Sequence, residues 1–391
     1  MDFRLTEEQL MLKATVREFA QKEVKPVAAE LDRRPNPLDR FPWDLWKKAH
    51  AMGLLALPLS QKWGGSGAGR LTQTIVCEEL GAGDGSFGKS VATHLQKVHF
   101  LERVLNEEQQ KEFIPEFMND DTYVIAHAMT EPEHGSDTNL PYDAPGATLK
   151  TFAYLDGDHY VINGMKRFIT QAAVAKLFYI WARTDKNKPI SQAIKAFLVR
   201  AGTPGLTIGH MDDEMGGRTE ARAEVILDNV RIPARYAIGE EETMYGAHSA
   251  SFLEDCLLVT TAGIGEARTC YEETREHTKT RMQGGKPIIE HVNVGTRVAD
   301  MLVGIEASRA LVQKIAWSWD NQHEFDPKMV FLAKAFVSDT LSKIYLDALE
   351  IWAGLGVQKD LPIERYFRNH FSTLHGGGTP VLDRIMAMKM L

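Results

Sequence analysis

The chain has 391 residues, a net charge of −8 at pH 7 and a charged-residue content of 25%. This length predicts two or three domains with a large buried core. The acidic balance argues against nucleic-acid binding, which needs a basic face. Three cysteines, Cys77, Cys256 and Cys270, have the spacing of neither a disulfide framework nor a metal site, so we expect them in the core.

The N-terminal segment from Met1 to Thr6 lacks the basic and apolar regions of a signal peptide. No run of about 18 apolar residues is present, so we expect no membrane insertion. These features predict a cytoplasmic protein.

Residues 1–122 are predicted to form a helical domain. Thr6 and Gln9 have the spacing of a capping box, and apolar residues then recur on one helical face. Further helices are expected to begin near Trp43, Leu71, Ser90 and Glu107.

Near Tyr123 the pattern changes to short runs of β-branched and aromatic residues, which predicts a β domain over residues 123–238, most simply a barrel or a sandwich. The Asn163-Gly164 dipeptide is typical of a hairpin turn. Strands are expected at residues 123–129, 148–155, 159–163, 176–183, 194–200 and 222–233.

Helical spacing returns in residues 239–391, which form the third predicted domain. Long helices are expected over residues 241–280, 288–319 and 327–355, followed by two shorter ones.

Two motifs stand close together in the middle of the chain. Residues 129–137 read M-T-E-P-E-H-G-S-D, and residues 163–170 read N-G-M-K-R-F-I-T. Together they resemble the acyl-CoA dehydrogenase family of FAD enzymes, and the resemblance covers essentially the whole chain. It implies an α+β multidomain fold with an N-terminal all-α domain, a central β-barrel or sandwich domain and a C-terminal four-helix bundle. It also implies a homotetramer.

The resemblance further implies FAD as cofactor and assigns residues to it. The residues expected along the flavin ring are His127, Met129, Thr130, Phe168 and Thr170. Gly135 and Ser136 are expected near the phosphate, and Ser136 also near the pantetheine of the substrate.

Three later segments extend the resemblance. The segment that begins with Arg281 and Gln283 resembles one whose arginine reaches the FAD phosphate across a subunit interface; a guanidinium suits such a contact. The segment with Glu350 and Gly354 resembles an adenosine loop, with glutamate where glutamine is usual. Thr379, in the C-terminal loop, is the remaining expected FAD contact.

Members of this family remove the α-proton of an acyl-CoA while a hydride passes to flavin N5. The base is usually a glutamate in a C-terminal loop, and here Gly377 stands at that position. The Gly377 N–H is still available to polarise the thioester carbonyl. Some members carry the base on a helix 26 residues before the phosphate-binding arginine, which here is Asp255. We therefore predict Asp255 as base, with an acidic pair Glu254-Asp255 on a solvated helix face as the alternative.

Three interpretations remain open at this stage. The enzyme acts on a bulky, cyclic or branched acyl-CoA, because two glycines replace large side chains over the flavin. Alternatively it performs other chemistry, such as 1,4-elimination on an alicyclic acyl-CoA or desulfination. In the third interpretation it is a non-catalytic subunit of a hetero-oligomer. The resemblance also implies an electron-transferring flavoprotein or a similar carrier as partner.

Overall fold

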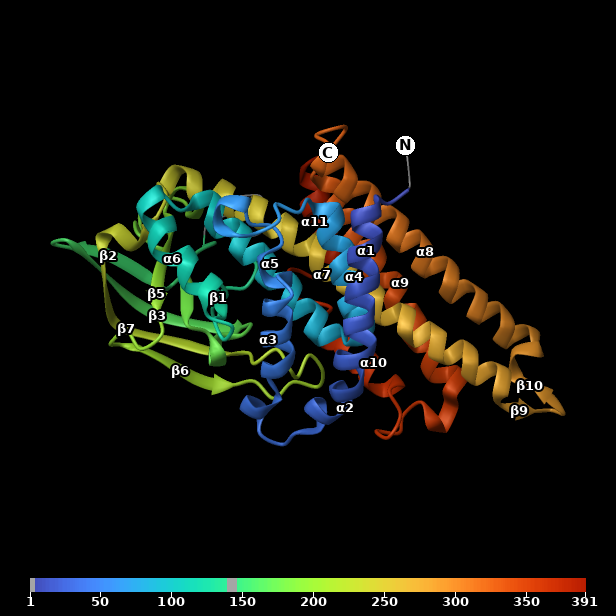
Figure 1. Cartoon of the computed structure of the whole chain (residues 1–391). Coiled ribbons are helices and arrows are strands. Elements are labelled where there is room, and N and C mark those ends of the chain that lie inside the picture. The colour runs from blue at the N-terminus through green and yellow to red at the C-terminus, as the bar shows by residue number, and fades with distance from the viewer. Residues whose placement is uncertain (1–3, 139–145) are drawn as a thin grey trace.

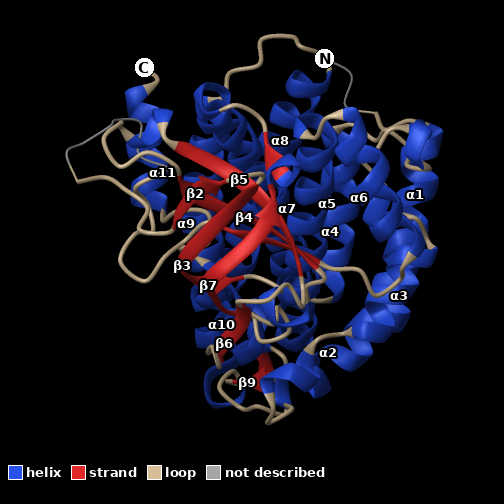
Figure 2. Ribbon diagram, turned by 90° about the vertical axis from the view of Figure 1, so that its left-hand side faces the viewer, coloured by secondary structure: helices blue, strands red, loops and turns tan. Residues whose placement is uncertain are grey.

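The computed structural model describes residues 4–138 and 146–391 and consists of helices, then a sheet, then helices again (Figure 1). This order confirms the predicted fold class. Viewed from the side of the sheet, the strands lie in front of helices from both terminal parts (Figure 2). Within the described ranges, none of the helices combines the length and apolar character needed to cross a bilayer.

From residue 4 onward the N-terminal part contains six α-helices, and the first begins at the predicted capping box of Thr6 and Gln9. The central helices α4 and α5 are buried along most of their lengths, which places residues of α5 at the heart of the molecule. The six are α1 (Glu7–Phe19), α2 (Lys25–Arg33), α3 (Trp43–Ala51), α4 (Arg70–Gly83), α5 (Gly85–Val104) and α6 (Glu107–Asn119).

The described residues of the middle part form one sheet of eight strands in the order β6-β7-β3-β2-β4-β5-β8, with β1 paired in parallel to β4. Six of the strands match predicted ones, whereas β6 and β8 were not predicted. The strands are β1 (Ile125–Ala128), β2 (Phe152–Asp156), β3 (His159–Ile169), β4 (Leu177–Arg183), β5 (Ile194–Arg200), β6 (Leu206–Met211), β7 (Ala223–Pro233) and β8 (Ala237–Ile238).

Strand β4 is buried on both faces, and this double burial attaches the sheet to the helices. Phe178 and Ile180 point into the core enclosed by the sheet itself. Tyr179 and Trp181 alternate with them and pack in a second core with Phe100 of α5. Since successive side chains of a strand face opposite ways, β4 carries both cores.

The predicted hairpin turn at Asn163-Gly164 is wrong. Strand β3 runs through both residues, and the chain reverses earlier, between β2 and β3. The register of β3 against β7 shifts between Ile162 and Gly164, which marks a bulge. A Cβ on Gly164 would lie 2.6 Å from the Cα of Thr151, so glycine is required there by the close approach of two strands.

The C-terminal part contains five helices, of which α7, α8 and α9 form the centre of one apolar core. The predicted segment 241–280 coincides with α7. The helices are α7 (Glu241–Thr280), α8 (Val292–Asp320), α9 (Lys328–Trp352), α10 (Ile363–Thr373) and α11 (Pro380–Lys389), and a small ribbon of β9 (Met282–Gln283) and β10 (Lys286–Pro287) follows α7. The three cysteines are buried and free, as expected.

Glycines let α4 cross α7 at very short range. A Cβ on Gly81 would lie 2.0 Å from the carbonyl oxygen of Ala262, and one on Gly265 would lie 1.9 Å from that of Glu78. Any larger residue would force the helices apart. The crossing fixes α4 and its neighbour α5 against α7, so that residues of α5 and α7 can line one cavity.

Candidate active site

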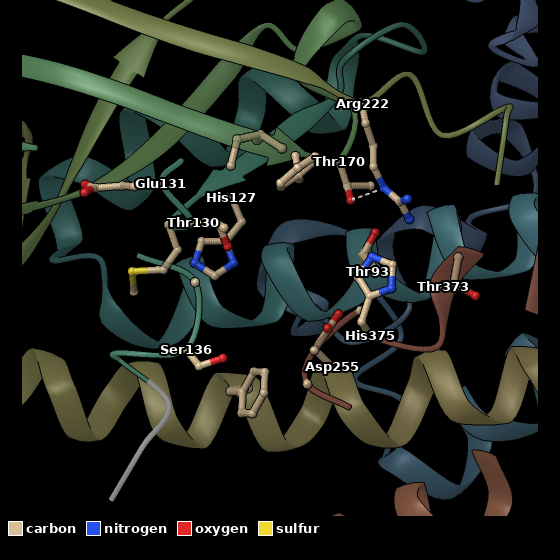
Figure 3. Close-up of a pocket in the computed structure, with 18 of the residues that line it drawn as sticks. Thr93, His127, Thr130, Glu131, Ser136, Thr170, Arg222, Asp255, Thr373 and His375 are labelled. Atoms are coloured by element: carbon tan, nitrogen blue, oxygen red, sulfur yellow. Dashed lines mark hydrogen bonds between the residues drawn. The ribbon is translucent and has the colours of Figure 1, made fainter. Parts of the chain in front are cut away.

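A cavity of about 590 Å³ lies where the sheet, α5, α7 and the loop before α11 meet. The structure brings most of the predicted site residues to its wall (Figure 3). These are His127, Met129, Thr130, Gly135, Ser136, Phe168, Thr170, Asp255, Gly377 and Thr379.

A buried ion pair holds the two central motifs together. Lys166 Nζ lies 2.8 Å from Glu131 Oε1, and the two side chains are 0% and 2% exposed. Glu131 also accepts hydrogen bonds from the backbone N–H groups of Lys150 (2.6 Å) and Thr151 (2.9 Å), and Lys166 donates to the carbonyl of Met129. The motif residues Glu131 and Lys166 therefore shape the loop that carries Thr130, Gly135 and Ser136.

The surroundings of Glu131 favour the ionised form of its carboxyl group. Burial raises the pKa of the Glu131 carboxyl, but the ammonium of Lys166 and the hydrogen-bond donors outweigh burial and hold that pKa below its ordinary value. Burial lowers the pKa of Lys166 to about 8. At neutral pH both groups carry their charges.

Arg222 is a site residue that the sequence analysis missed. Its Nε lies 3.4 Å from the hydroxyl of Thr170 (Figure 3). Its guanidinium also pairs with Glu214 and Glu220. The three charged groups orient the end of β3 at the cavity. Only the pairing of β7 with β3 brings Arg222 next to Thr170, so no local motif could reveal it.

Asp255 and Gly377 approach the same point of the cavity from different elements. Gly377 has φ +66°, and a Cβ on it would lie 3.8 Å from Oδ2 of Asp255 and 3.6 Å from the ring of Phe252. Asp255 projects from α7 into the space beneath Thr170, beside His375 (Figure 3). The carboxylate of Asp255 therefore lies in the same region of the cavity into which a side chain at position 377 would project.

Burial raises the pKa of Asp255 to about 6, although the ammonium groups of Lys97 and Lys334 oppose this shift. A carboxyl group with such a pKa is still largely ionised at pH 7 and is a stronger base than an ordinary aspartate. Burial and charge therefore give Asp255 properties suited to a general base.

Glu254 faces away from the cavity. It is 1% exposed, and its Oε2 lies 2.7 Å from Nδ1 of His99, with Arg70 Nε at 3.8 Å from Oε1. The alternative of an acidic pair on a solvated helix face is therefore wrong: one carboxylate is buried against α4 and α5, and the other lines the cavity. The separation of about 100° between neighbours on a helix explains the difference.

The C-terminal loop is fastened to the helices beneath it. Lys334 of α9 donates to the carbonyl of Gly378 and pairs with Asp383 at 2.8 Å. The hydroxyl of Thr379 accepts a hydrogen bond from the N–H of Leu382 and caps α11. These contacts give the glycine-rich loop a fixed position over the cavity.

Models of three domains match successive parts of the chain: the acyl-CoA dehydrogenase N-terminal domain matches residues 6–121, the middle domain matches 126–230, and the C-terminal domain matches 248–391. A short-chain-specific acyl-CoA dehydrogenase of Clostridium acetobutylicum is 32% identical over 388 residues, which are 99% of this chain and 98% of the relative. The chain belongs to the acyl-CoA dehydrogenase family.

Other members widen this comparison. A cyclohex-1-ene-1-carbonyl-CoA dehydrogenase of Geobacter metallireducens is 33% identical over 390 residues, covering 99% of this chain and 98% of that one. The solved FAD complex of PigA is 26% identical, with a TM-score of 0.89 over 100% of this chain and 99% of that one. As a family member, the chain is a flavoprotein-type oxidoreductase that acts on the CH–CH group of its donor.

Four predicted cofactor residues lie apart from the cavity. Arg281 directly follows the end of α7 and Gln283 lies in β9, both exposed, while Glu350 and Gly354 lie near the end of α9. An α-helix rises about 1.5 Å per residue, so Arg281 is roughly 39 Å along α7 from Asp255. These residues cannot reach the cavity of their own chain.

Glu350 has a cation beside it: the guanidinium of Arg297 forms an ion pair with its carboxylate. This pairing reduces the negative charge that Glu350 presents to any nearby phosphate.

Proposed function

We propose that this protein is an FAD-dependent acyl-CoA dehydrogenase for a bulky, cyclic or branched acyl-CoA, with Asp255 as the base that removes the α-proton. The observation that carries the proposal is the position of Asp255 Oδ2, 3.8 Å from where a Cβ of residue 377 would stand. Membership of the family supports FAD as cofactor and an acyl-CoA as substrate. The geometry of this cavity supports Asp255 as the base and a bulky acyl group.

The residues at the cavity wall fit a flavin. The Nε2 atom of His127 is buried without a hydrogen-bond partner among the described residues, as expected of a group that meets a polar ring edge. Phe168 is 54% exposed yet lines the cavity, so it offers an apolar surface to a flat ring. Thr130 and Thr170 add hydroxyl groups, and Gly135 has open space around it.

In this proposal His127, Met129, Thr130, Phe168 and Thr170 hold the ring of FAD, and Gly135 and Ser136 lie toward its phosphate. When bound, FAD supplies the two-electron acceptor for the oxidation. The protein itself positions the cofactor and the substrate and accepts the proton. Arg222 keeps the Thr170 hydroxyl directed at the cavity, and the Glu131–Lys166 pair keeps the Thr130 loop in place.

Two groups of this chain act on the substrate. The backbone N–H of Gly377 donates a hydrogen bond to the thioester oxygen, which stabilises negative charge as the α-proton leaves. Asp255 accepts that proton, because it is ionised at pH 7 and approaches from the α7 side. Gly376 and Gly377 present no side chain to the cavity, and this space suits a ring or a branch better than a thin linear chain.

The test replaces Asp255 by asparagine. Removal of a general base lowers a rate by about 10²–10⁴-fold, and anaerobic mixing with a reactive acyl-CoA measures that rate as flavin bleaching. Glu254→Gln is the matched control, because it makes the same chemical change one residue away on a side chain that faces His99. The control is expected to bleach within about threefold of wild type.

If the flavin of the Asp255→Asn variant bleaches at the wild-type rate, Asp255 is not the base. A panel of acyl-CoA thioesters tests the proposed substrate class. A clear preference for straight-chain over alicyclic acyl groups would contradict the proposal of a bulky acyl group. Robust turnover by the chain purified alone would in turn exclude the non-catalytic-subunit interpretation.

The proposed assembly is a homotetramer in which Arg281, Gln283, Glu350 and Gly354 serve the FAD of a partner subunit. Their distance from the cavity of their own chain and the exposure of Arg281 support this arrangement. An electron-transferring flavoprotein is the proposed carrier for reoxidation. The cytoplasmic location stays a prediction.

A further inference from the structure

Four lysines are buried among the described residues, and two of them, Lys89 and Lys97, have neutral hydrogen-bond partners instead of a carboxylate. Lys166 and Lys334 each lie 2.8 Å from a carboxylate. Lys89 donates to the hydroxyl of Thr373 and approaches a carbonyl. Lys97 is 2% exposed, yet in the part of the chain that the structure describes its hydrogen-bond partner is the neutral side-chain oxygen of Gln171, at 2.7 Å.

Lys97 is also the buried lysine that lines the cavity. The carboxylates of Asp255 and Glu220 act on its charge, but among the described residues neither lies within the 4.0 Å of an ion pair. A buried ammonium without a paired anion is costly, because its three donors lose water and gain one acceptor. A ligand that brings an anion into the cavity would remove this cost.

The surrounding wall is polar as well. Thr93, Gln96 and Lys97 share one face of α5, and His248, Ser251 and Asp255 share the facing side of α7. Gln96 donates across the gap to the hydroxyl of Ser251. A purely hydrocarbon acyl group would offer the ammonium of Lys97 no further hydrogen-bond acceptor.

We propose that the acyl group of the substrate carries a second acid group, a carboxylate or a similar oxyanion, which binds the ammonium of Lys97. This inference rests on the proposed function and narrows its substrate class to acyl-CoAs with an acidic substituent. Asp255 then meets the α-proton while Lys97, more than 4.0 Å away, meets the acid group. The two opposite charges orient the acyl chain between α5 and α7.

The test compares thioesters that differ only in charge. Glutaryl-CoA and succinyl-CoA are set against the corresponding ω-carboxamides, which have nearly the same shape but no charge. Calorimetry with the protein loaded with flavin that has already been reduced measures the dissociation constants without turnover, because no electron acceptor is present. A hydrogen bond between charged groups contributes about 1.5–3 kcal/mol, so the carboxylate is expected to bind about tenfold to a hundredfold tighter than the amide.

Lys97→Met keeps the length of the side chain and removes its charge. The variant is expected to lose the preference for the carboxylate and to bind the amides within about threefold of wild type. Lys97→Gln serves as a second neutral variant, and thermal unfolding confirms that both fold. Lys47→Met, the same change on an exposed position of α3, is expected to keep the wild-type preference.

Equal affinity of the wild type for carboxylate and amide would overturn the inference, as would a preference that survives in Lys97→Met. If uncharged acyl-CoAs bind and bleach the flavin while the acid group has no effect, only the inference fails. If no CoA thioester binds at all, the proposed function fails with it.

Discussion

Replacing Lys166 by methionine removes one partner of an almost fully buried ion pair in the β domain. In wild type Glu131 receives hydrogen bonds from Lys166 Nζ at 2.8 Å and from two backbone N–H groups at 2.6 and 2.9 Å. The variant leaves the carboxylate of Glu131, 2% exposed, with its backbone donors but without a counter-charge.

Breaking a buried ion pair by removing one partner costs about 3–5 kcal/mol. The loss in Lys166→Met is therefore expected in that range. Glu131→Met is expected to lose more, because it also leaves the N–H groups of Lys150 and Thr151 unpaired, at about 1–3 kcal/mol each. The difference between wild type and Lys166→Met is expected to be largest near neutral pH. It decreases above pH 8, where Lys166 of the wild type loses its charge, and also on acidification toward the ordinary pKa of glutamate, since the depressed pKa of Glu131 stabilises the fold only while that group is ionised.

Urea unfolding at a fixed excess of FAD, followed by tryptophan fluorescence, measures the loss. Lys176→Met is the matched control: Lys176 lies 2.6 Å from Asp120 in the same part of the chain, but their side chains are 43% and 37% exposed. A surface pair contributes about 0–1 kcal/mol. If Lys166→Met loses no more stability than Lys176→Met, the pair does not hold the loop as argued.

Two further predictions concern the proposed base. Because the pKa of Asp255 is raised to about 6 and a base acts when deprotonated, kcat/KM is expected to fall about tenfold between pH 7 and pH 5; a profile in Asp255→Asn with the same slope would contradict this. Gly377→Glu places a carboxylate beside Asp255 at a left-handed φ, which costs about 1–2 kcal/mol. In the Asp255→Asn background, Gly377→Glu is expected to raise the rate of flavin reduction by a straight-chain thioester at least tenfold. No gain would show that carboxylates at the two positions do not remove a proton from the same carbon atom.

The sequence predicted long elements well where one signal dominated. Helix α7 was placed at residues 241–280 because an apolar face repeats over eleven turns, and the capping box at Thr6 marked the start of α1. Strand β6, by contrast, was missed: it lies at the end of the sheet, and only its first residue, Leu206, is buried. An exposed edge strand lacks the apolar alternation on which the prediction depends.

The Asn163-Gly164 error has a different origin. A hairpin turn and a bulge both need glycine's freedom, so the dipeptide alone does not distinguish them. The bulge is decided by the close approach of Thr151, the residue before β2, to Gly164. Lys97 and Arg222 were missed for a similar reason, because each becomes a cavity residue only through contacts with distant segments, at Gln171 and Thr170 respectively.

Helix α7 has a consequence for how the cofactor is kept. It carries Asp255 in the middle and Arg281 at its end, too far apart for a single FAD of the same subunit. If Arg281 at the far end contacts the FAD of a neighbouring subunit, dilution that separates the subunits also removes this contact and weakens the binding of each flavin. Colour loss on dilution and subunit dissociation would then follow one concentration dependence, and prosthetic-group retention would be a collective property of the oligomer.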